Sequence, residues 1–162
     1  MKRIFFIASF PLILKLSGCM TSHTPYTYHM LNNADHDIFA GYGLKSSAPH
    51  FYPDTTFEKL SNYELIKSHS YNFHHIKKPL DETIKIETPV DTVSIFYFHA
   101  DTVSKYTWEI IQHDYKILRR YDLSSEDIRT LYGGKRGTYP EIPYPPDERM
   151  QDMKMYPPYG SE

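Results

Sequence analysis

Residues 93–99, Val-Ser-Ile-Phe-Tyr-Phe-His, constrain the fold more than any other segment of the chain. Strand side chains alternate between two faces, so Ile95 and Tyr97 would share one face and the two phenylalanines the other. A strand that is apolar on both faces must be covered on both, which is typical of the middle of a packed sheet. We therefore expect the domain to be built around this strand.

Alternation of apolar and polar residues predicts further strands along the chain. They are expected at residues 36–44, 70–76, 83–88 and 116–121. A segment containing Lys78 and Pro79 separates residues 70–76 from 83–88, and this spacing predicts a hairpin with a longer loop. Residues 57–66 are ambiguous and would also fit one short helical turn.

Two segments change to a helical period. One helix is expected from an N-cap at Ser104 to about residue 114. The second begins at Ser124, where Asp127 three residues later resembles a capping box, and ends near residue 132 before two glycines.

The end of the chain is rich in proline, which excludes a helix or a central strand throughout it. From Tyr139 onward there are six prolines, at positions 140, 143, 145, 146, 157 and 158. The order of the elements predicts an α+β fold: a small antiparallel β-sheet or sandwich with two short helices and an extended Pro/Tyr-rich C-terminal tail.

Composition narrows the classes of function. The chain has 162 residues, 40% of them hydrophobic and 23% charged, which is typical of one globular domain. With a net charge of -2, the chain lacks the excess of basic residues that is typical of a nucleic-acid binder, so no nucleic-acid partner is expected. The single cysteine excludes an internal disulfide and a cysteine-built zinc or iron-sulfur site, and no cofactor is expected.

The first 18 residues are organised like a secretory signal. Lys2 and Arg3 are basic, and residues 4–14 form an uncharged apolar run. As a helix this run would span roughly 16 Å, well short of the ~30 Å hydrocarbon core of a bilayer. After Lys15 follows Leu16-Ser17-Gly18-Cys19, which resembles the lipobox of bacterial lipoproteins.

This resemblance implies cleavage before Cys19 and diacylation of its sulfur, which would anchor the protein to a membrane. Because Met20 and not aspartate follows, it also implies the outer membrane, on either its periplasmic or its surface side. The alternative is an ordinary buried cysteine. The expected organisation is a signal peptide at 1–18, a lipidated cysteine and tether at 19–31, one globular domain at 32–138 and a tail at 139–162.

The body of the chain resembles a group of small uncharacterised exported proteins of Bacteroidota. The resemblance rests on residues 52–55, 91–98, 100–102, 108–109, 115–124 and 153–159. It implies fold and export but no chemistry. It also implies O-glycosylation after aspartate at Thr55, Thr92 and Thr102, although each threonine would serve equally well as a turn or strand residue.

The nine histidines suggest a metal site, but their spacing does not support one. His74 and His75 are adjacent in a predicted strand and would point to opposite faces. His99 and Asp101 could supply two ligands from one side of a strand, without a visible third. Histidines at strand ends and turns are the simpler interpretation, and the motifs of serine hydrolases, zinc proteases and P-loop enzymes are absent.

Aromatic residues are abundant, and tyrosines cluster towards both ends of the chain. We expect exposure of Tyr26, Tyr28, Tyr139, Tyr144, Tyr156 and Tyr159. Exposed tyrosines suit a protein or carbohydrate partner, although tyrosine also packs well on sheets. The sequence thus favours a lipid-anchored cell-envelope protein with a non-catalytic binding or accessory role. The alternatives are an enzyme or metal-binding protein with a dispersed site at His99 and Asp101, and a purely structural envelope component.

Overall fold

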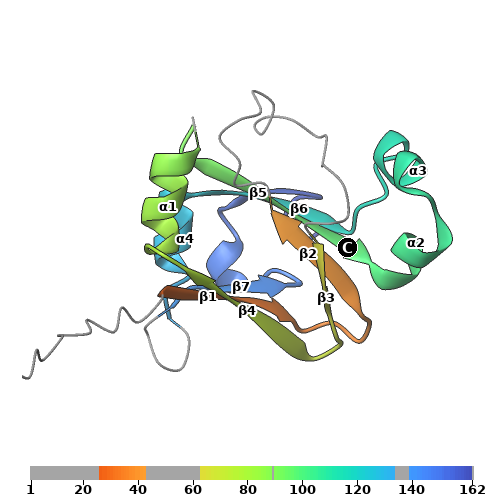
Figure 1. Ribbon diagram of the computed structural model, residues 1–162, viewed down its shortest axis with the longest axis horizontal. Helices are drawn as coiled ribbons and strands as arrows, with labels where there is room; N and C mark the ends of the chain where they lie inside the picture. Colours follow the sequence, from red (N-terminus) through yellow and green to blue (C-terminus); the bar gives the residue numbers. More distant parts are fainter. Residues whose placement is uncertain (1–25, 43–62, 89, 134–138, 162) are drawn as a thin grey trace, which may run out of the picture.

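The computed structural model describes residues 26–42, 63–88, 90–133 and 139–161. Within these ranges the chain forms two β-sheets, four short α-helices and one 3-10 turn (Figure 1). The expected α+β fold with a small, mostly antiparallel sheet architecture is confirmed. None of the described helices is both long and apolar enough to cross a membrane.

The larger sheet has five strands in the order β3-β2-β5-β6-β8, all antiparallel. The strands are β3 (Tyr63–Ile66), β2 (Ile38–Tyr42), β5 (Thr92–His99), β6 (Arg119–Ser124) and β8 (Lys154–Tyr156). Strand β5 lies in the middle, and the six residues at positions 93–98 are all buried. The prediction of a central strand, covered on both faces, is therefore confirmed.

The smaller sheet has the order β4-β1-β7, with β4 (Ser70–Ile76), β1 (Tyr26–Asn32) and β7 (Glu141–Tyr144). Strand β1 pairs antiparallel with β4 and parallel with β7. The expected tether at 19–31 is wrong for its described part, because residues 26–31 belong to this central strand. Tyr28 and Met30 alternate inward and are buried, a pattern that the intervening Thr27 and His29 obscure.

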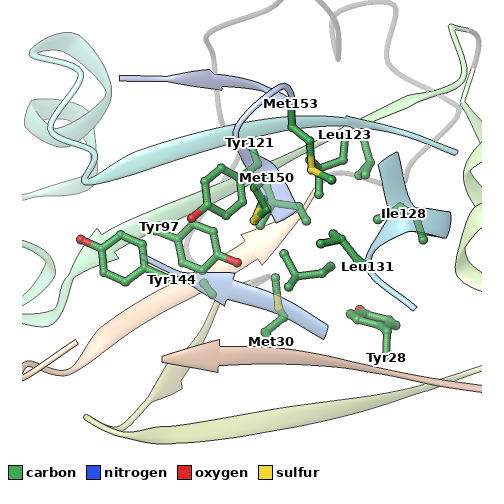
Figure 2. Packing of buried hydrophobic residues seen from close by; sticks show 14 of the residues in the cluster. Tyr28, Met30, Tyr97, Tyr121, Leu123, Ile128, Leu131, Tyr144, Met150 and Met153 are labelled. Carbon is green, nitrogen blue, oxygen red and sulfur yellow. The ribbon is translucent and has the colours of Figure 1, made fainter. Parts of the chain in front are cut away.

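The core lies between the two sheets. Figure 2 shows side chains from β1, β5, β6, β7 and α4 meeting in one buried cluster. Helices α1 (Leu80–Glu87) and α4 (Ser125–Thr130) lie side by side at one end of the molecule (Figure 1), joined by a 3.0 Å contact between Arg129 Nε and Asp81 Oδ2. They contribute Ile84 and Ile128 to the core.

Helix α1 replaces a predicted strand. Residues 83–88 alternate, but the side chains that the structure buries are Leu80, Thr83 and Ile84, which follow helical spacing. Ile86, which a strand would have placed on the same face as Ile84, is exposed. Pro79 precedes the first turn and acidic residues lie within it, both favourable at a helix start.

The helix expected at 104–114 is two helices, α2 (Ala100–Lys105) and α3 (Trp108–His113), separated by Tyr106 and Thr107. The N-cap of α2 is His99, not Ser104, whose hydroxyl donates to the Asp101 carbonyl. The following strand begins at residue 119 rather than 116. The apolar residues at helical spacing thus predicted helical structure in this region correctly, but they did not predict the break between α2 and α3.

The second predicted helix start is confirmed in detail. In the capping box of α4, the Asp127 amide donates to Ser124 Oγ at 3.1 Å and the Ser124 amide donates to Asp127 Oδ2 at 2.8 Å. The proline-rich tail is extended as expected, in the short edge strands β7 and β8 around the 3-10 turn η2 (Glu148–Met150). It also packs into the core through Ile142 and Met150.

Candidate functional site

The two sheets differ in how their outer faces are covered. On the five-stranded sheet, Phe96 and Phe98 point outward and pack with Ile111 of α3 in a second buried cluster. Trp108 adds to this cover, with its ring 5.6 Å from that of Phe98. This face is therefore part of the protein interior.

The outer face of the three-stranded sheet is open. Tyr71 and Phe73 of β4 point outward and are 54% and 58% exposed. The side chains of Asn72 and His74, on the opposite face of the same strand, are turned inward and are half-buried. The middle of strand β4 is thus inverted, with Asn72 and His74 turned inward and Tyr71 and Phe73 turned to solvent, while Ile76 at its end faces inward and packs against the core. Because soluble proteins normally bury such residues, the inversion points to a function.

The inward polar side chains have partners that explain how the inversion is tolerated. Asn72 Nδ2 donates to Glu64 Oε2 at 3.1 Å, and His74 Nδ1 lies 3.7 Å from Glu64 Oε1. The His74 ring also stacks on Tyr28 at 4.7 Å. Burial, with Glu64 opposing it, lowers the pKa of His74, so the ring is neutral near pH 7.

Aromatic rings cross all three strands of the open face. The ring of His29 in β1 stacks on Tyr71 at 5.1 Å and on Tyr139, which precedes β7, at 4.0 Å. Phe73 lies beside them and packs edge-on against His75 at 5.3 Å. We call these five residues the aromatic face.

The aromatic face carries little charge. Burial lowers the pKa of His29, while Glu141, its neighbour in β7, opposes that effect. The ring is therefore mainly neutral near pH 7. His75 Nδ1 lies 3.2 Å from the hydroxyl of Thr27, which fixes its position at the end of the face. A surface of exposed aromatic rings without lysine, arginine or acidic residues of its own suits contact with another macromolecule.

The expectation of six exposed tyrosines is wrong for two of them. Tyr28 and Tyr144 are buried in the core, because their strands turn them towards the opposite sheet. Tyr26, Tyr156 and Tyr159 are exposed, as expected. Tyr139 is half-buried in the aromatic face.

Sequence reasoning missed Tyr71 and Phe73. Their alternation with Asn72 and His74 was visible, but it predicted only that the strand has two unlike faces. The expected orientation would bury the aromatic side, and nothing local in the sequence indicates the reverse.

His99 and Asp101 are brought together, but in a structural role. His99 Nδ1 accepts a hydrogen bond of 3.1 Å from the Asp101 amide and caps α2. His36 stacks on His99 with ring centroids 4.4 Å apart and planes 15° apart. The nitrogen lone pairs of stacked rings lie in parallel planes and do not converge on one ion. The residues that the structure describes contain no group of three suitable metal ligands.

A buried polar network crosses β5 and β6 on the outer side of the five-stranded sheet. Ser94 Oγ donates to Asp122 Oδ1 at 2.7 Å, and Arg120 Nε lies 3.2 Å from the same oxygen. Arg120 also donates to the Tyr115 hydroxyl at 2.8 Å. The network is a cross-strand ion pair.

Cys19 and Thr55 lie outside the described residues. Thr92 begins β5, and its hydroxyl donates to the Val90 carbonyl at 3.2 Å. Thr102 lies in α2 and is half-buried.

No protein-family model matches the chain, and neither a curated protein nor a solved structure is significantly similar to it.

Proposed function

We propose that this chain is a lipid-anchored protein of the bacterial cell envelope, attached to the outer membrane through Cys19, with a non-catalytic binding role. The observation that carries the binding role is the inversion of β4, which turns Tyr71 and Phe73 to solvent. The anchor rests on the signal-like N-terminus and the lipobox-like Leu16-Ser17-Gly18-Cys19.

The energetics favour a partner on the aromatic face. Burying a large apolar side chain gains about 1.5–3 kcal/mol, and the exposed rings leave most of that gain unused in the isolated chain. A partner that covers Tyr71 and Phe73 would recover it. Phenylalanine and tyrosine are also enriched in the cores of protein interfaces.

The stacking geometry favours a protein over a carbohydrate as the partner. A sugar ring binds by lying on a free aromatic face, as in other stacking interactions. In the aromatic face, His29 has Tyr71 on one side and Tyr139 on the other. The His29 ring at the centre of the row is therefore not free to stack on a sugar, which favours the side chains of a protein as the contact.

The proposed anchor would keep this face near the membrane. Only six residues separate Cys19 from Tyr26, the first residue of β1. Even fully extended, the seven steps from Cys19 to Tyr26 reach at most about 25 Å. The N-terminal end of β1, and with it the three-stranded sheet, would be held within that distance of the lipid.

Membrane fractionation of the full chain and a Cys19→Ala variant tests the anchor. We expect the wild-type protein in the membrane pellet, with an intact mass that begins at Cys19 and includes acyl groups. The variant should leave the pellet, because only the acyl chains supply the binding energy. Unchanged fractionation, or a wild-type species that begins at Met1 without lipid, would exclude this function.

A photoreactive phenylalanine analogue placed at Phe73 in intact cells tests the binding role. We expect discrete adducts at this position and none with the same analogue at Ile86, an exposed apolar residue of α1. Equal labelling at both positions would mean that the aromatic face has no specific partner.

A further inference from the structure

The four edge strands of the described sheets differ in how they are protected against pairing with another strand. Strand β7 contains Pro143, β8 has three residues and begins with Lys154, and β3 has four residues and contains Glu64. Prolines, charges and short length are the usual means of preventing edge-to-edge association. Three edges are therefore protected.

Strand β4 has none of these features. It is seven residues long and contains no proline, lysine, arginine or acidic residue. Its only strand neighbour among the described residues is β1. Its contacts with β3 come from the side chains of Asn72 and His74, which reach Glu64, and Asn72 Nδ2 also donates to the Leu65 carbonyl at 3.3 Å. Among the described residues, no strand pairs with the other edge of β4.

We propose that the edge of β4 pairs antiparallel with β4 of a second copy of this chain, forming a symmetric dimer. The two three-stranded sheets would then become one continuous sheet. In the register centred on the two-fold axis, Phe73 faces the partner's Phe73, and Tyr71 faces the partner's His75. The aromatic faces of both copies would lie on the same side and form one surface.

The second copy fits this edge because the strand is complementary to itself. In a symmetric antiparallel pair, a charged residue near the axis would lie close to its own copy. Residues 70–76 contain no lysine, arginine or acidic residue, and the burial that lowers the pKa of His74 favours its neutral form. Aromatic side chains directly opposite one another are among the favourable cross-strand pairs.

The symmetry also agrees with attachment of both copies to one membrane. The two-fold axis that relates antiparallel neighbours is perpendicular to the sheet, so both copies present the same outer face. With this axis along the membrane normal, the two β1 strands begin at equal heights. The dimer rests on the edge of β4 and does not require the lipid anchor.

Site-directed thiol cross-linking of the full chain in membranes tests the register. We expect Phe73→Cys to give a covalent dimer with a short bis-thiol reagent, because paired residues have Cβ atoms about 5 Å apart. Tyr71→Cys alone should not react, because its own copy lies four residues along the strand, about 13 Å away. The double variant Tyr71→Cys, His75→Cys should cross-link again.

The controls separate this proposal from the function proposed above. Cross-linking of the wild-type chain would show that Cys19 is a free thiol. That result would contradict the anchor but not the dimer. Phe73→Cys would then be tested in a chain that also carries Cys19→Ala. Equal yields from Phe73→Cys, Tyr71→Cys and a Leu65→Cys control on edge strand β3 would overturn the dimer. An adduct with a different protein at Phe73, without the dimer, would overturn it as well.

A Phe73→Lys variant gives an independent measurement in detergent solution. Two lysines would meet at the axis, and we expect the dimer dissociation constant from light scattering to rise at least about tenfold, since like charges oppose association. Leu65→Lys, a charge added at the edge of β3, should leave it unchanged. A wild-type protein that is monomeric at all concentrations would contradict the proposal.

Discussion

The two outer faces of the molecule carry similar aromatic side chains and have opposite fates. On the five-stranded sheet, Phe96 and Phe98 are covered by the segment that forms α2 and α3. On the three-stranded sheet, Tyr71 and Phe73 remain exposed. The comparison shows that outward aromatic residues on a strand indicate a packing surface. Whether that surface is covered within the protein depends on whether another segment of the same chain packs on it.

The positions of the helices agree with this difference between the two outer faces. Helices α1 and α4 pack at one end and α2 and α3 at the other (Figure 1). Turning Asn72 and His74 inward also requires partners for their polar atoms, which the partly exposed Glu64 and the ring of Tyr28 supply. The open face is thus a supported feature of the fold rather than incomplete packing.

The largest effect is expected from Phe98→Ala. Its side chain is fully buried, so the variant should lose about 3–5 kcal/mol of the free energy of unfolding. Urea denaturation of this variant and of the matched Phe73→Ala variant measures the difference. Phe73→Ala should cost much less in a monomeric sample, and equal losses would contradict the distinction between the two faces.

A smaller loss is expected when the cover itself is reduced. Trp108→Ala removes a ring that packs on both Phe98 and Tyr63, and should cost about 2–3 kcal/mol because the site is only partly buried. It should also increase binding of a hydrophobic fluorescent dye, since the second cluster becomes accessible. Unchanged dye binding would mean that another part of the chain provides the cover.

The pH dependence of the free energy of unfolding should arise mainly from the three-stranded sheet. Among the histidines that the structure describes, the pKa is lowered, mainly by burial, for His29 in β1 and His74 in β4. Below the unfolded value of 6.5 the unfolded chain binds protons that the folded chain resists, so stability should fall as the pH drops through that value.

Denaturation at pH 7.5 and pH 5.5 tests this assignment in variants that cannot titrate. His74→Gln should reduce the loss of stability on acidification, because it removes one of these groups. His113→Gln, a change at an exposed position of α3, serves as the control and should not. If both variants lose the same stability between pH 7.5 and pH 5.5, His74 is not a source of the pH dependence.

The smallest effect on stability is expected on the open face itself. Replacing Tyr71 and Phe73 by threonine keeps a high strand propensity and removes only exposed rings, so each change should alter the free energy of unfolding by about 0.5 kcal/mol or less. The same double variant should lose dimerisation. A large loss of stability in a monomeric sample would mean that these rings hold the monomer together.

Sequence reasoning predicted those elements whose local and tertiary preferences agree. Strand β5 is apolar on both faces and the α4 start carries its own capping residues, so each is specified by nearby side chains. Strand β1 was missed although its buried Tyr28 and Met30 alternate with polar residues, because the polar segment directly after the lipobox-like motif was interpreted as a tether. Helix α1 was mistaken for a strand because its apolar residues fit both periods.

The candidate site was less predictable than the fold. Exposed tyrosines were expected at the ends of the chain, and Tyr139 does join the aromatic face. The orientation of β4, however, depends on Glu64 and Tyr28, which meet it only in the folded molecule. The unprotected edge likewise depends on which strands become edges, and pairing order is not a local property of the sequence.

Amide hydrogen exchange across residues 70–76 tests most directly whether the open sheet is an interface between two copies. In the wild-type protein at concentrations where the dimer forms, these amides should exchange more slowly than in Phe73→Lys, because the free edge of β4 becomes hydrogen-bonded. The amides of β5 should exchange equally in both, which shows that the fold is intact. Equal exchange of residues 70–76 in the two proteins would contradict the account.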